Sequence, residues 1–248
     1  MNLFELFETF ALTESPHERR IAEEEILEHF VNMLNERTME MLRSLGLVNR
    51  QLSYSQLYNF EYRQYLSAIL RGFRGRIQEF LGREPPPTAQ ELAYKLSWEV
   101  ERIRATEDRH MNQTGIINAY IFYQSVRPGL IITKNWRANI HLQSTCQSCR
   151  WLHNQPPIPI NQPFLIHGQE WVGQDGEPNV YNYIDRQVSI AHPNCRCWIE
   201  IEIFQRLEDG TRERIGIIKL EPTTEMIKLI EECGCCAKGE SHVTNRAF

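Results

Sequence analysis

Residues 192–203 read His192-Pro-Asn-Cys195-Arg-Cys197-Trp-Ile-Glu-Ile-Glu-Ile203. The second half of this stretch alternates apolar and acidic side chains with period two, which predicts a strand with one buried face. A turn signal follows at 208–211 and a second strand-like run at 215–220, so we expect a β-hairpin. The first half places an imidazole and two thiols directly before that hairpin.

A second pair of thiols, Cys146-x-x-Cys149, lies upstream, with a spacing that lets one turn present both sulfurs to one metal. His192 and Cys195 repeat the two-residue gap, and Cys197 is a spare or alternative ligand. Zinc prefers four nitrogen and sulfur ligands in a closed tetrahedron. The spacing therefore predicts a structural zinc site, with His192 favoured over Cys197 as the fourth ligand because it repeats the gap.

Two other interpretations of these cysteines stay open, namely buried free thiols and disulfides formed on oxidation. The chain has seven cysteines, none of them in the first 145 residues, and an odd count without a secretory signal argues against a disulfide framework. Cys233, Cys235 and Cys236 stand apart, and we expect them in a flexible tail. With His242 they would form a weaker second metal site.

The first half of the chain is expected to be helical. Ser15-Pro-His-Glu18 and Thr88-Ala-Gln-Glu91 are capping boxes that each open a helix. An apolar pattern at 57–81 predicts another helix, and residues 83–87 form a proline-rich joint. The helix from Thr88 is expected to break near Gly115, with a further helical piece at 116–125. The segment 3–10 is amphipathic, either as core or as an arm that docks on a partner.

These patterns predict an α+β protein with a mainly helical N-terminal half and a small zinc-stapled domain that contains the β-hairpin. The expected organisation is a helical arm and bundle over 1–87, a domain with the Cys/His cluster over 88–232, and a tail over 233–248. A last helix is expected over 224–232.

The composition is that of an ordinary globular protein. The 248 residues include 27 Lys plus Arg against 32 Asp plus Glu, and 42% are hydrophobic. A net charge of −5 gives no general attraction to nucleic acid, so such a contact must be local. The sequence has no apolar run of about 18 residues and no basic secretory leader, so we expect a soluble protein of a reducing cytoplasm, without a membrane partner.

The cysteine motifs, taken together, resemble the phage head morphogenesis family, the minor capsid proteins of the phage Mu F type. The resemblance covers roughly residues 90–200. It rests on the hexapeptide 192–197, on Cys146-x-x-Cys149 with Trp136 before it, and on Arg104-Ala-Thr-Glu107. The family often has an Asp before the first cysteine pair, where this chain has Asn139 and His141. By itself, the stretch 104–107 would be a solvated helix face.

This resemblance implies a structural virion protein that acts in head assembly and is not an enzyme. The implied partners are the portal and the major capsid or scaffold proteins. The implied location is the virion head, and the host cytoplasm during assembly. The chain has no His-x-Glu deaminase signature, His-Glu-x-x-His, P-loop or Gly-x-Ser-x-Gly elbow, and a closed four-ligand zinc site leaves no position for substrate water.

Arginine accounts for 22 of the 27 basic residues, a bias that favours bidentate contacts with phosphate or carboxylate. Arg71, Arg74, Arg76 and Arg83 form a candidate contact with phage DNA or with an acidic portal rim. The ordinary alternative is a solvated helix face. The cluster supports a second function, that of a zinc-stapled DNA-binding protein assisting genome packaging or delivery.

Overall fold

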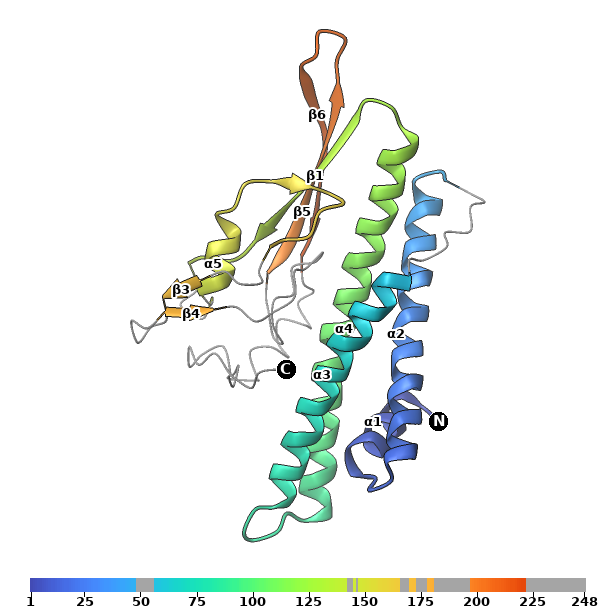
Figure 1. Cartoon of the computed structure of the whole chain (residues 1–248), viewed down its shortest axis with the longest axis vertical. Coiled ribbons are helices and arrows are strands. Elements are labelled where there is room, and N and C mark those ends of the chain that lie inside the picture. Colours follow the sequence, from blue (N-terminus) through green and yellow to red (C-terminus); the bar gives the residue numbers. More distant parts are fainter. Residues whose placement is uncertain are drawn as a thin grey trace. The chain divides into compact units, whose positions relative to one another are not determined.

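The computed structural model describes residues 1–47, 56–141, 145, 147–165, 170–172, 178–180 and 197–221, with only the backbone at 56–61, 147–148, 170–172 and 178–180. The protein is α+β, as expected. Its first half is mostly helical, and a small antiparallel four-stranded sheet follows (Figure 1). The predicted helix at 224–232 and the predicted tail lie outside the described residues.

The chain divides into two compact units, which are described separately. The first comprises residues 1–37 and 47–111, and the second comprises 38–46 and 112–248. Two long helices, α2 (Pro16–Ser44) and α4 (Ala89–Val126), contribute residues to both units.

The helices begin where capping groups satisfy their first backbone N–H groups. Helix α1 (Leu3–Leu12) starts with a capping box, in which Asn2 Oδ1 accepts from the Glu5 N–H at 2.9 Å and the Glu5 carboxylate accepts from the Asn2 N–H at 2.8 Å. Thr88 and Glu91 form the same arrangement before α4. Gly46, with φ +73°, follows α2 in the left-handed conformation typical of a helix stop. The starts of α2 at Pro16 and of α4 at Ala89 confirm the two predicted capping boxes.

Helix α3 (Gln56–Leu81) ends before Gly82, also as predicted, but the expected break near Gly115 is wrong. Helix α4 runs without interruption from Ala89 to Val126. One glycine in a helix interior costs only about 1 kcal/mol relative to alanine. Thr114 is 1% exposed and its neighbours Met111 and Ile117 are fully buried, so packing along this stretch outweighs that cost.

No helix in the described ranges combines the length and apolar character needed to cross a bilayer.

Helix α1 belongs to the core of the first unit. Leu6, Phe7, Phe10 and Ala11 are buried, and the Phe7 ring meets Phe73 of α3 edge to face, with centroids 5.6 Å apart. The same core contains apolar residues of α2, α3 and α4, such as Ile26, Leu70 and Val100. Of the two interpretations of segment 3–10, core packing is confirmed.

The second unit is built on a sheet of strand order β2-β1-β5-β6. Its strands are β1 (Leu130–Arg137), β2 (Ile158–Pro159), β5 (Trp198–Arg206) and β6 (Arg212–Leu220), and all neighbours are antiparallel. Strands β5 and β6 form the predicted hairpin, with Gly210 at φ +85° in its turn. A separate two-stranded ladder joins β3 (Glu170–Val172) to β4 (Pro178–Val180).

The core of the second unit lies on one face of this sheet. Ile199 and Ile201 are fully buried while Glu200 and Glu202 are only partly buried, which confirms the alternation predicted for residues 198–203. The core also takes Trp136 of β1 and, from α4, Ile117 and Tyr120. Gln113 Nε2 of α4 donates to the Leu220 carbonyl at 3.1 Å, so the helix is tied to the end of β6.

We predict that Phe7→Ala lowers the free energy of unfolding of the first unit by about 3 to 5 kcal/mol, because it removes a fully buried ring and leaves a cavity against Phe73. Phe4→Ala in the same helix is the matched control, since Phe4 is 38% exposed. Urea unfolding followed by circular dichroism measures both. Equal, small effects of the two substitutions would contradict the place of α1 in the core.

Candidate functional site

Two of the five predicted metal ligands lie in the described part of the chain. Cys149 is on α5 (Gln147–His153) and is 2% exposed, and Cys197 directly precedes β5 and is 3% exposed. Both belong to the buried core around Trp136. Each predicted half-site therefore sends one thiol into the same core.

The sheet explains how these two thiols reach the same core. Arg137, the last residue of β1, pairs with Trp198, the first residue of β5, so Cys197 lies beside the residue that follows β1. That residue, Ala138, donates its N–H to His153 Nδ1 of α5 at 3.1 Å. The end of β1 thus holds both the start of β5 and the helix that carries Cys149.

An ion pair reinforces this end of the sheet. Arg137 donates to Glu200 Oε1 from its Nη2 at 2.8 Å and from its Nε at 3.2 Å. The two residues belong to adjacent strands, β1 and β5. The contact fixes the same strand pairing that brings Cys197 beside Ala138.

His153 lies near Cys149 in sequence, but its ring makes a structural hydrogen bond and is not placed to bind a metal. Its Nδ1 accepts the Ala138 N–H, so in the neutral ring the proton is on Nε2 and neither nitrogen offers a lone pair to a metal. Burial, and to a lesser extent the positive charge of Arg137, lowers the pKa of His153 and favours this neutral form. His153 therefore serves as an anchor between α5 and β1.

Cys146, His192 and Cys195 lie outside the described residues, as do Cys233, Cys235, Cys236 and His242. Within the part that the structure describes, no group of three or more His, Cys, Asp or Glu side chains is arranged to hold a metal. The zinc site stays a prediction.

The four predicted contact arginines have different surroundings. Arg71 is exposed and Arg74 is partly buried on α3. Arg76 binds the carboxylate of Glu99, and Arg83 lies over the ring of Phe80, with its Cζ 4.8 Å from the centroid.

Glu99 is a buried carboxylate at the centre of a charged cluster that the sequence did not predict. Its side chain is 1% exposed and accepts from three cations: Arg76 Nε at 3.1 Å to both oxygens, Lys95 Nζ at 2.9 Å and Arg102 Nη2 at 2.9 Å. Burial raises the pKa of Glu99, but the charges of Arg102 and Arg76, with hydrogen bonds from Arg76 and Lys95, outweigh it and bring the pKa to about 2.

Glu107 is a second buried carboxylate, whereas Arg104 is exposed, so the stretch 104–107 is only in part the solvated helix face that it would be by itself. Glu107 is 0% exposed and accepts from the hydroxyls of Tyr62 and Tyr65, each at 3.0 Å. His110 Nδ1 lies 3.4 Å from it, and the His110 ring packs edge to face on both tyrosines. Tyr62 and Tyr65 thus pack between α3 and α4.

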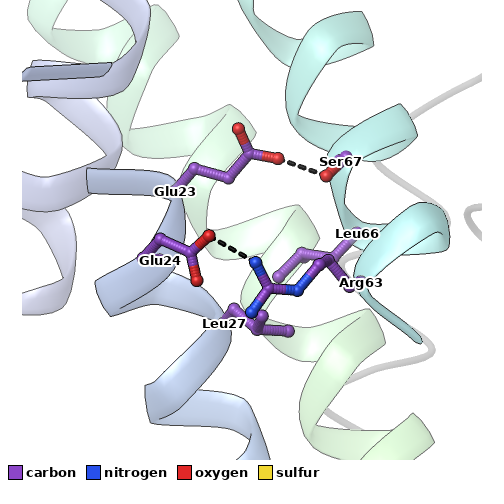
Figure 2. Close-up of a pocket in the computed structure, with 6 residues that line it drawn as sticks. All are labelled: Glu23, Glu24, Leu27, Arg63, Leu66 and Ser67. Carbon is purple, nitrogen blue, oxygen red and sulfur yellow. Dashed lines mark hydrogen bonds and ion pairs between the residues drawn. The ribbon is translucent and has the colours of Figure 1, made fainter. Parts of the chain in front are cut away.

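Two further polar features lie apart from these clusters. Lys134 of β1 is 0% exposed with its Nζ 5.2 Å from the centre of the Phe164 ring, and burial lowers its pKa to about 7. A small pocket between α2 and α3 contains the contacts Arg63–Glu24 and Ser67–Glu23 (Figure 2). Since both carboxylates are engaged by α3, we assign this pocket to helix packing.

Comparison of the chain with protein-family models, with curated proteins and with solved structures finds no match.

We predict that Glu99→Gln lowers the free energy of unfolding by about 3 kcal/mol at neutral pH, because it removes the carboxylate that three cations share. The folded pKa is depressed, so this contribution is complete above the ordinary value of 4.5 and disappears as the pH falls toward about 2. Unfolding in urea between pH 2 and 7 measures the difference between the two proteins.

Glu101→Gln is the control for this experiment, since Glu101 forms an exposed ion pair with Arg104 at 3.1 Å. Its effect should stay below about 1 kcal/mol. If the wild type and Glu99→Gln differed in free energy of unfolding by the same amount at pH 2 as at pH 7, the assigned role of the Glu99 charge would be contradicted.

Proposed function

We propose that this chain is a structural minor head protein of a tailed bacteriophage, whose C-terminal unit is stapled by zinc. The observation that carries the proposal is the burial of Cys149 and Cys197, one from each cysteine motif, in the same core. The resemblance of the motifs at 146–149 and 192–197 to the phage head morphogenesis family supplies the biological role.

Cys146, Cys149, His192 and Cys195 would hold the metal, with Cys197 as the alternative to His192. The two described cysteines fit this role, because they come from segments far apart in sequence and reach the same end of the sheet. Zinc would contribute its coordination energy to folding by linking these segments. The segment between the two cysteine motifs is rich in proline and polar residues and offers little apolar surface to bury, so a contribution from zinc would suit it.

The proposed role is assembly and not catalysis. The proposed partners are the portal and the major capsid or scaffold proteins, in the host cytoplasm during assembly and in the virion head afterwards. The alternative function, a zinc-stapled DNA-binding protein for packaging or delivery, shares the zinc site and differs only in the partner. Mass spectrometry of purified procapsids and virions tests the assembly role. We expect a few copies per particle, and absence from both particles would contradict it.

We predict about one zinc per chain in protein purified without added metal, measured by elemental analysis. The double variant Cys146→Ser plus Cys195→Ser should lose the metal and unfold at a lower temperature. The double variant Cys235→Ser plus Cys236→Ser is the matched control and should keep both the metal and the melting temperature. Zinc retained by the first variant would contradict the assigned ligands.

The fourth ligand is settled by a further pair of variants. We predict that His192→Asn reduces zinc affinity at least about ten-fold in competition with a chromophoric chelator, while Cys197→Ser keeps it within about two-fold. The reverse order would assign the metal to Cys197 and leave His192 outside the site.

A further inference from the structure

One face of α4 in the first unit carries an exposed aromatic ring among basic side chains. Tyr94 is 74% exposed, more than any other large apolar side chain of the described residues. Trp98 lies one helical turn further on the same face. Lys95 and Arg102 both hold their charges over the Trp98 ring, with Nζ 5.1 Å and Cζ 5.7 Å from its centre. Trp98 thereby holds two cations on the face of α4 that also carries Tyr94.

The charge of this face is not balanced within its cluster. Glu99 supplies one negative charge to three cations, namely Arg76, Lys95 and Arg102. Two positive charges are left over, and the side chains of Arg76 and Lys95 are 38% and 28% exposed. Glu101 pairs with Arg104, whereas Glu91 caps α4 through the neutral groups of Thr88 and keeps its negative charge one turn before Lys95, so one net positive charge remains on this face. The buried Glu99 fixes the cations in place without neutralising them.

We propose that this α4 face binds single-stranded nucleic acid. An unstacked base would lie on the exposed Tyr94 ring, and the neighbouring phosphates would contact Lys95 and Arg76, while Arg102, whose side chain is only 11% exposed, would act through its charge. Aromatic rings beside a cationic groove bind single strands because every base offers a stacking face. A base inside a duplex is already stacked on both sides, so a duplex could use only the cations.

The exposed tyrosine also distinguishes this ligand from an acidic protein segment. Carboxylates would pair with Lys95 and Arg76 but would gain nothing from a ring that is 74% exposed. The inference does not depend on the zinc site or on the head-protein role. The proposed contact at Tyr94, Lys95 and Arg76 shares only Arg76 with the four arginines predicted from the sequence.

Fluorescence anisotropy of a short labelled oligo(dT) tests the stacking step, with the full chain titrated at low salt. We expect binding by the wild type, binding weakened about five-fold or more by Tyr94→Ala, and binding kept within about two-fold by Tyr94→Phe. A duplex of the same length should be affected little by either substitution. Absence of oligo(dT) binding at low salt, or equal binding by wild type and Tyr94→Ala, would overturn the proposal.

The charged contacts are tested by the salt dependence of the same titration. Lys95→Gln should weaken binding and reduce the slope of log K against log salt by about 0.7, which is the value for one phosphate of a single strand. Arg20→Gln, which removes an exposed cation on α2, should change neither quantity. An unchanged slope in Lys95→Gln would overturn the assigned phosphate contact. Displacement of oligo(dT) by polyglutamate with no effect of Tyr94→Ala would instead assign the face to an acidic protein.

Discussion

The pairing of β1 with β5 is the constraint on which the second unit depends. It sets Arg137 opposite Trp198, and this register places Cys197 beside Ala138. The hydrogen bond from Ala138 to His153 then fixes α5, and with it Cys149, at the same place. One thiol from each of two cysteine motifs more than 40 residues apart therefore lies in the same core. Zinc bound there would add a further link between two segments that the sheet already holds together.

The first unit depends on buried charge as much as on apolar packing. Glu99 and Glu107 both lie on α4, almost fully removed from water, and both take their interhelical partners from α3. Because an unpaired charge in such a place is costly, these contacts fix how α3 lies against α4. Glu99 also orders Lys95 and Arg102 on the helix face that carries the exposed Tyr94. One buried carboxylate can thus shape a surface that it does not itself reach.

Much of the fold could be predicted from local patterns, and the failures have physical causes. The capping boxes before α2 and α4 and the alternation in β5 are local signals, and they predicted these elements correctly. Strand β1 was not predicted, because the buried Lys134 and Asn135 hide its alternation. Helix α5 has only seven residues, too few for a helical period to show. Gly115 was given too much weight, since packing along α4 outweighs its intrinsic cost.

The burial of Glu107 depends on Tyr62 and Tyr65, more than 40 residues away, so no local pattern could reveal it. Cys149 and Cys197 were chosen as candidate ligands from the spacing of the cysteines alone. That both lie in the same core depends on the register between β1 and β5, which the cysteine spacing does not reveal.

The central claim is that one zinc ion is held by sulfur ligands from both cysteine motifs. X-ray absorption at the zinc edge, on protein purified without added metal, tests it most directly. The account predicts a four-coordinate first shell with three sulfur atoms at about 2.3 Å and one nitrogen at about 2.0 Å. In Cys195→Ser one of the sulfur atoms should disappear from this shell. A shell of oxygen and nitrogen alone, or a protein that contains no zinc, would contradict the claim.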